Sequence, residues 1–123
     1  MSPLPLFVYG TLRSDASEGA MLGDRRRESA TVRGHLFVMP AGYPAVSLAG
    51  NDVVHGELVF GIDEGILSVL DLYEGTHEGL YRRAEVTCTS GLRAVRAVAY
   101  VMDDPKRIGG RYLPKGRWRA PRQ

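Results

Sequence analysis

DEGILSVLDLYEG, at residues 63–75, is the one segment of this sequence with the periodicity of an α-helix. Asp63 is suited to cap the first turn, because its side chain can accept a hydrogen bond from a free backbone N–H group there. Gly75 is suited to end the helix, because glycine readily adopts the left-handed conformation that closes many helices. The segment therefore predicts one main helix over residues 63–73, with these apolar residues at helical spacing: Ile66, Leu67, Val69, Leu70 and Tyr73.

Strand patterns occupy most of the remaining chain. Leu6-Phe7-Val8-Tyr9 is a short apolar run that ends at Gly10, and residues 32–38 alternate with a period of two. Further strands are predicted at residues 45–49, 53–62, 81–88 and 93–102, with a turn at 50–52 and a hairpin turn at Ser90-Gly91. About six short strands with one main helix predict an α+β fold with a small, mixed, strongly curved, barrel-like sheet.

Length and composition indicate a single globular unit. The chain has 123 residues, of which 44% are hydrophobic and 24% charged, and these values are typical of one ordinary domain. Cys88 is the single cysteine, which excludes a disulfide framework and a zinc site built on several thiolates. The histidines do not have the spacing of metal ligands, so no metal site is predicted.

The N-terminal residues do not resemble a targeting segment. Residues 1–9 have no basic region and only a short apolar run, unlike a signal peptide. No apolar stretch approaches the roughly 20 residues that a membrane-spanning helix needs, so no membrane association is expected. A cytoplasmic location is therefore predicted, and a lone reduced thiol agrees with it.

Charge is distributed unevenly along the chain. Residues 106–123 hold seven basic residues and no acidic one, whereas residues 1–105 hold nine basic and fourteen acidic residues. We therefore predict a domain at residues 1–105 and a basic C-terminal extension at residues 106–123. Such an extension can bind nucleic acid, or it can be solvated or docked on its own acidic body. Nucleic acid is the less favoured partner, because the extension has no recognised binding motif.

Glu74 is the candidate residue for acid–base chemistry. It follows Ile66 and Leu70 at steps of four, which places it at the edge of the helix's apolar face. Partial burial and the negative end of the helix dipole would both raise the pKa of this carboxyl. A carboxylate with a raised pKa can act as a general base near neutral pH. The alternatives are that Glu74 is an ordinary rim glutamate, or that Glu78 in the following loop has this role.

The turn Tyr9-Gly10-Thr11-Leu12 is the candidate binding element. A strand runs into a glycine, which permits a sharp turn with successive backbone N–H groups pointing into one concavity. Such a nest binds a carboxylate or an oxyanion. The alternative is a simple turn at the end of a strand.

Five motifs in order resemble the gamma-glutamyl cyclotransferase-like superfamily, and in particular its short branch of gamma-glutamylamine cyclotransferases and avirulence-induced-gene-like proteins. The resemblance spans residues 6–100. The motifs are Phe7-Val8-Tyr9-Gly10-Thr11-Leu12-Arg13, Gly42-Tyr43-Pro44-Ala45, Val54-His55-Gly56-Glu57-Leu58, Leu70-Asp71-Leu72-Tyr73-Glu74-Gly75 and Leu80-Tyr81-Arg82-Arg83.

The resemblance implies an intramolecular reaction. The α-amine of a gamma-glutamyl compound attacks its own γ-carbonyl, which yields 5-oxoproline and a free amine without a protein nucleophile. Glu74 matches the family's catalytic glutamate, which would take the amine's proton and pass it to the leaving amine. Only proton and acyl transfer occur, so no metal or organic cofactor is implied. The resemblance also implies six substrate-binding residues. Backbone N–H groups of Gly10, Thr11 and Leu12 would hold the α-carboxylate, and the rings of Tyr9, Tyr43 and Tyr81 would line the pocket.

The implied partner is a small-molecule gamma-glutamyl substrate, and a monomer is expected for a domain that buries its own core. The glutathione-metabolising branch carries Tyr-Gly-Ser where this chain has Tyr9-Gly10-Thr11, which disfavours glutathione-type substrates. Several leaving amines agree with the sequence, namely a lysine side chain, a small amine, an amino acid or a carrier-bound group. An alternative on the same fold is a non-catalytic small-molecule binding or interaction module.

Overall fold

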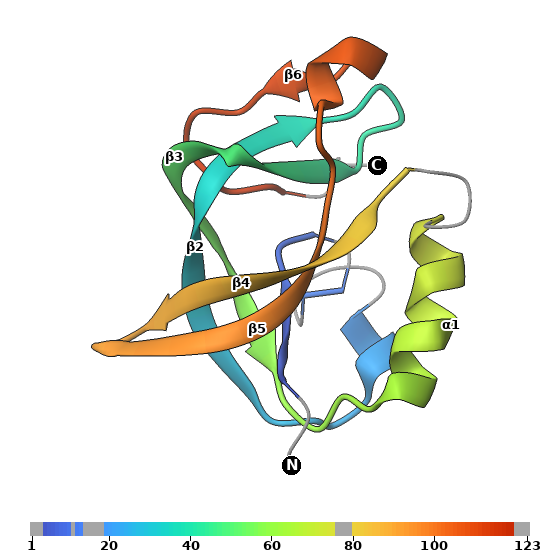
Figure 1. The fold of residues 1–123 in the computed structure, drawn as a ribbon, viewed down its shortest axis with the longest axis vertical. Coiled ribbons are helices and arrows are strands. Elements are labelled where there is room, and N and C mark those ends of the chain that lie inside the picture. The colour runs from blue at the N-terminus through green and yellow to red at the C-terminus, as the bar shows by residue number, and fades with distance from the viewer. Residues whose placement is uncertain (1–3, 11, 14–18, 76–79, 120–123) are drawn as a thin grey trace.

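Strands and helices account for most of the chain in the computed structural model, which describes residues 4–10, 12–13, 19–75 and 80–119. The elements in chain order are β1 (Leu6–Val8), η1 (Gly19–Leu22), β2 (Arg27–Val38), β3 (Pro44–Val59), α1 (Glu64–Glu74), β4 (Arg82–Ser90), β5 (Arg93–Val101), η3 (Pro105–Ile108) and β6 (Arg111–Tyr112). The α-helix lies on one side of the strands, opposite the tip of the β4–β5 hairpin (Figure 1).

Five of the strands close into a barrel. β1 lies between β3 and β5, β5 pairs with β4, β4 pairs with β2, and β2 pairs with β3 to complete the ring. β1 is parallel to β5, and the other neighbours are antiparallel. β6 is a sixth strand that pairs with the end of β2. The predicted α+β fold, with a mixed barrel-like sheet and one main helix, is confirmed.

The β2–β3 pair differs from the prediction at one point. A turn was expected at residues 50–52, but β3 continues through them as a strand, so this prediction is wrong. Gly34 lies opposite Asp52 whereas His35 lies opposite Ser47, so residues 48–51 bulge out of the ladder. Gly34 permits this approach, because a Cβ there would lie 2.7 Å from the Ser47 carbonyl oxygen. The turn-like residues therefore form a bulge within one strand.

The helix α1 begins and ends as its sequence predicts. The Asp63 side chain accepts a hydrogen bond from the Ile66 N–H group at 2.9 Å, an interaction that typically stabilises a helix by about 1 kcal/mol. Gly75 adopts a left-handed conformation with φ of 70°, and its N–H group bonds to carbonyls of the last turn. Leu67 and Leu70 are buried against the sheet and hold the helix in place.

Two apolar clusters form the core. One lies between the helix and the sheet and includes Leu6, Val8, Leu67, Leu70, Tyr81, Tyr100 and Met102. The other includes Phe7, Tyr9, Val54, Leu58, Val86, Cys88, Ala99 and Trp118. Successive residues of β1 contribute to different clusters, because side chains alternate across a strand. Cys88 is fully buried, and burial raises the pKa of its thiol to about 11, which agrees with a small apolar filler.

The segment after residue 105 contacts the barrel. Tyr112 of β6 lies opposite Phe37 of β2, and the His55 N–H group donates to the Gly116 carbonyl at 2.8 Å. Trp118 is 3% exposed, and its indole N–H donates to the Gly42 carbonyl oxygen at 2.9 Å. Thus the described part of the predicted basic extension packs on the strands through backbone pairing and one buried aromatic side chain.

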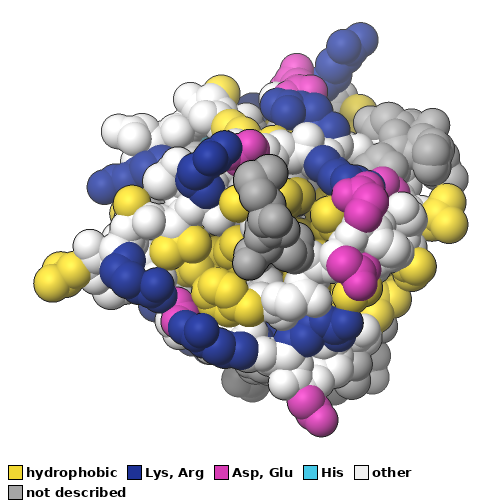
Figure 2. Space-filling model, turned by 60° about the horizontal axis from the view of Figure 1, so that its bottom comes forward, with side chains coloured by type: hydrophobic (Ala, Val, Ile, Leu, Met, Phe, Trp, Pro, Cys, Tyr) yellow, Lys and Arg dark blue, Asp and Glu magenta, His cyan; other side chains and the backbone are white. Residues whose placement is uncertain are grey.

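Several surface arginines are paired with acids. Arg93 lies 2.5 Å from Glu28, Arg82 lies 2.9 Å from Asp103, and Arg96 pairs with Glu85. Figure 2 shows one face on which basic and acidic side chains surround apolar ones. Exposed pairs of this kind each contribute little to stability, typically below about 1 kcal/mol. In the described part of the chain, no helix has the length and apolar character required to cross a membrane.

Candidate active site

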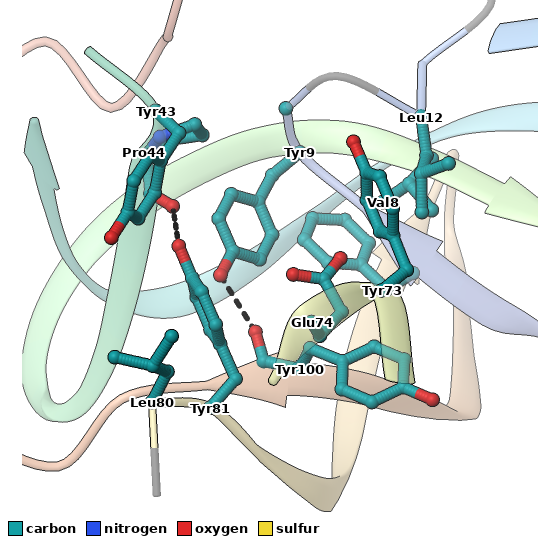
Figure 3. Close-up of a pocket in the computed structure, with 12 residues that line it drawn as sticks. Val8, Tyr9, Leu12, Tyr43, Pro44, Tyr73, Glu74, Leu80, Tyr81 and Tyr100 are labelled. Atoms are coloured by element: carbon teal, nitrogen blue, oxygen red, sulfur yellow. Dashed lines mark hydrogen bonds between the residues drawn. The ribbon is translucent and has the colours of Figure 1, made fainter. Parts of the chain in front are cut away.

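A cavity of about 250 Å³ lies where the end of α1 meets the end of β1 and the start of β3 (Figure 3). It is lined by twelve residues from distant parts of the chain, which are Phe7, Val8, Tyr9, Gly10, Leu12, Tyr43, Pro44, Tyr73, Glu74, Leu80, Tyr81 and Tyr100. The lining is mainly apolar and aromatic. Glu74 is the one carboxylic acid in the described lining, which contains no lysine, arginine or histidine.

Glu74 is the last residue of α1, and its carboxyl points toward Tyr9 (Figure 3). Burial raises the pKa of this carboxyl from an ordinary value of 4.5 to about 7. The physical cause is desolvation, because a charge in an apolar cavity loses its hydration. None of the described lining residues is a lysine, arginine or histidine that would offset this cost. Glu74 can therefore exchange a proton near neutral pH.

Tyr9 forms a wall of the cavity and is held by two hydrogen bonds. Its hydroxyl donates to the Tyr100 carbonyl oxygen at 2.6 Å and accepts from the Val46 N–H group at 3.2 Å. Burial, followed by the neighbouring charge of Glu74, raises the pKa of Tyr9. The hydroxyl is thus neutral and engaged with the backbone, and the ring faces the cavity.

Tyr43 and Tyr81 form the opposite wall. Their ring centroids lie 6.1 Å apart with a 50° angle between the ring planes. The Tyr81 hydroxyl donates to the Pro44 carbonyl oxygen at 2.5 Å, which ties the start of β3 to the segment before β4. Burial is the main cause that raises the pKa of Tyr81, so this hydroxyl is also neutral. All three aromatic residues predicted for the pocket, Tyr9, Tyr43 and Tyr81, therefore line the cavity.

Gly10 and Leu12 also line the cavity, close to the end of β1. Gly10 lies against Pro44: a Cβ at position 10 would come within 2.5 Å of the proline Cγ atom. The Gly10 carbonyl accepts a hydrogen bond from the Arg13 N–H group at 3.1 Å, which closes a tight turn. Thr11 lies outside the described residues, and so does Glu78. The predicted nest of N–H groups therefore stays a prediction.

Several lining residues were not identified as site residues from the sequence, namely Phe7, Val8, Pro44, Tyr73, Leu80 and Tyr100. Tyr73 precedes Glu74 directly, and that adjacency could have suggested it. Tyr100 lies in the apolar second half of β5, and nothing local in the sequence indicates that it reaches the helix. No group of three or more His, Cys, Asp and Glu side chains suited to a metal ion occurs within the described ranges.

Known proteins share this fold. An AIG2-like protein (ggact) from Mus musculus has 20% identity, with 100% of this chain and 99% of that chain covered, and a TM-score of 0.76. YkqA from Bacillus subtilis has 26% identity and a TM-score of 0.73; the match covers 96% of this chain, which spans only 40% of YkqA. A structure described as gamma-glutamyl cyclotransferase has 19% identity, coverage of 89% and 68%, and a TM-score of 0.64. No curated protein matches this chain.

A family model describes nearly the whole chain. The model for "Gamma-glutamyl cyclotransferase, AIG2-like" matches residues 6–120. This match contains every residue predicted for the site, and it extends past the resemblance found in the motifs, which ended at residue 100. The resemblance to the superfamily is confirmed. The chain belongs to the gamma-glutamyl cyclotransferase, AIG2-like family.

Proposed function

We propose that this chain is a gamma-glutamyl cyclotransferase-type enzyme. It converts a gamma-glutamyl amine or gamma-glutamyl amino acid into 5-oxoproline and a free amine, with Glu74 as the general acid and base. The observation that carries the proposal is the Glu74 carboxyl, which faces a small apolar cavity and has a pKa raised to about 7. Membership of a family that includes cyclotransferases supports the reaction class.

The reaction needs one residue that takes and returns a proton. The substrate's α-amine, in its neutral form, attacks the γ-carbonyl carbon, and ionised Glu74 accepts the proton that the attacking nitrogen loses as the bond forms. The new C–N bond closes the five-membered ring. The bond from the γ-carbon to the leaving nitrogen breaks as Glu74 returns its proton to that nitrogen. Atoms and charge balance, and the enzyme ends in its starting state.

Positioning supplies the remainder of the catalysis. The substrate has to fold back on itself so that its amine meets its own carbonyl, and a small rigid cavity favours that near-attack geometry. In the proposal, backbone N–H groups of Gly10, Thr11 and Leu12 hold the α-carboxylate. The rings of Tyr9, Tyr43 and Tyr81 bound the space in which the glutamyl chain folds.

Release of 5-oxoproline tests the proposed reaction. The wild-type protein is incubated with gamma-glutamyl-lysine, gamma-glutamyl-alanine, gamma-glutamyl alkylamines and glutathione, and 5-oxoproline and free amine are both quantified. We expect equal amounts of the two products from at least one substrate other than glutathione.

The matched control is alpha-glutamyl-alanine, in which the peptide bond lies at the α-carboxyl and the same ring closure cannot release alanine. Each substrate is also incubated without protein to measure spontaneous cyclisation. Absence of 5-oxoproline above this background, for every substrate, contradicts the proposal and favours a non-catalytic binding module on the same fold.

A further inference from the structure

Arg83, at the start of β4, fastens α1 to the barrel through two charged partners. Its Nε atom donates to Asp71 Oδ1 at 2.7 Å and its Nη2 atom to Asp71 Oδ2 at 2.5 Å, which is a two-point pairing. Its Nη1 atom lies 2.8 Å from Glu64 Oε1, at the other end of the helix. One guanidinium group therefore contacts both the first and the last turn of α1, and this constrains the tilt and rotation of the helix.

Tyr100, on β5, extends this network to the cavity. Its hydroxyl donates to Asp71 Oδ1 at 2.7 Å and lies 3.1 Å from the Leu67 carbonyl oxygen. Its own carbonyl oxygen accepts the hydrogen bond from Tyr9. Hydrogen bonds therefore join Arg83 to Asp71 and Asp71 to the Tyr100 side chain, and the backbone carbonyl of Tyr100 holds the Tyr9 hydroxyl at the cavity wall.

Asp71 precedes Glu74 by three residues, so both belong to the last turn of α1. Helix ends fray unless they are held, and Leu72, in the same turn, is exposed to solvent. The Asp71 side chain is only 19% exposed, and that of Arg83 is 31% exposed. The ion pair between Arg83 and Asp71 is thus partly shielded from water, and it holds the same helical turn that carries Glu74.

We propose that Arg83 and Asp71 are positioning residues that hold the end of α1 so that the Glu74 carboxyl stays inside the cavity. The inference rests on the proposed function of Glu74. Neither Arg83 nor Asp71 lines the cavity itself. A displacement of about 1 Å in a catalytic group can lower a rate by roughly 100-fold. Loosening this turn would let the carboxyl swing toward solvent.

Arg83→Lys is the most informative variant, because it keeps the positive charge and removes the two-point geometry. We expect kcat for 5-oxoproline release to fall about 10- to 100-fold with KM changed less than threefold. The acidic limb of the kcat/KM profile should move to lower pH, because a more hydrated Glu74 has a lower pKa. Retained charge at position 83 excludes a simple electrostatic cause of that shift.

The other titratable side chains that line the cavity with Glu74 are tyrosines, which come from the end of β1, the segments before β3 and β4, β5 and α1 itself: Tyr9, Tyr43, Tyr81, Tyr100 and Tyr73. Burial raises the pKa of Tyr9, Tyr81 and Tyr100, away from the range in which Glu74 titrates. The charged pair Arg83 and Asp71 acts on the site through Tyr100. A shifted acidic limb therefore reports on Glu74.

Arg82→Lys is the matched control, because Arg82 is adjacent in sequence, exposed, and paired with Asp103 away from the cavity. This variant should keep the wild-type kcat and pH profile. Unfolding temperatures of all three proteins separate a loss of folded protein from a loss of positioning. An Arg83→Lys protein with wild-type kcat and pH profile overturns the inference, as does a loss that matches the unfolded fraction.

A second readout separates this inference from the proposed reaction. The carboxyl carbon of Glu74 can be titrated by ¹³C NMR without substrate, with its signal assigned by its absence in Glu74→Gln. We expect a lower midpoint in Arg83→Lys than in the wild type and no change in Arg82→Lys. If the wild type releases no 5-oxoproline, the proposed function fails, and this titration still decides the inference: equal midpoints in all three proteins overturn it.

Discussion

Glu74→Gln is expected to lower kcat for 5-oxoproline release by 100-fold or more. Glutamine has nearly the same shape as glutamate but cannot accept the proton of the attacking amine, and general acid–base catalysis typically contributes about 10²- to 10⁴-fold. KM should change little, because the proposed binding groups lie on other elements. Initial rates of the variant and the wild type, measured on the preferred substrate at pH 8, give the result directly.

Two control variants accompany the rate measurement on Glu74→Gln. Glu85→Gln removes an exposed carboxylate on β4 that pairs with Arg96, and it should leave the rate unchanged. Glu78→Gln tests the alternative that the sequence leaves open for the loop after α1. A Glu74→Gln protein within tenfold of the wild-type rate excludes Glu74 as the base, and a large loss in Glu78→Gln alone assigns the role to Glu78.

The same substitution is expected to stabilise the protein at alkaline pH. The pKa of Glu74 is about 7 in the folded state, against about 4.3 for an unfolded glutamate. The folded state therefore binds the proton more tightly, and ionisation opposes folding. At about 1.4 kcal/mol per pKa unit, the cost reaches up to about 4 kcal/mol.

The pH window follows from these two pKa values. Below about pH 4 the carboxyl is protonated in both states and costs nothing. The cost grows as pH rises from about 4.3 to 7, and it is fully present above pH 7. Glutamine has no such ionisation, so Glu74→Gln should unfold at a higher urea concentration than the wild type at pH 8. The difference should shrink by more than half at pH 5.

Comparison of the two proteins at each pH removes the contribution of all other titrating groups. Glu85→Gln again serves as the control, because an exposed carboxylate should give the same small difference at both pH values. A Glu74→Gln protein that is less stable than the wild type by the same amount at pH 5 and pH 8 contradicts the proposed burial cost. Loss of activity with a gain in stability is the pattern expected of a strained functional site.

Local features of the sequence were sufficient to predict the helix and the place of Glu74. The cap at Asp63, the apolar spacing and Gly75 act over a few residues, so their effect can be deduced without tertiary structure. The position of Glu74 at the edge of the apolar face follows from the same periodicity. The alternation of short strands likewise predicts a curved sheet, although the bulge at residues 48–51 resembled a turn.

The network behind Glu74 could not be predicted in this way. Arg83 follows Asp71 by 12 residues and Tyr100 follows it by 29, and neither interval is a helical or strand period. These side chains meet because β4 and β5 close the barrel beside α1. From the sequence, Tyr100 could therefore be predicted only to lie in a strand, and Arg83 only to belong to a family motif. The closure of the barrel, rather than local sequence preference, brings both side chains to Asp71.

The ionisation of Glu74 in the substrate-free wild-type protein is the most direct test of this account. Its ¹³C carboxyl resonance is followed from pH 3 to pH 9, with the signal assigned by its absence in Glu74→Gln. The account predicts a midpoint near pH 7, because the carboxyl is desolvated in an apolar cavity. A midpoint near 4.5, the ordinary value for glutamate, would show that the carboxyl is solvated and would contradict the central claim.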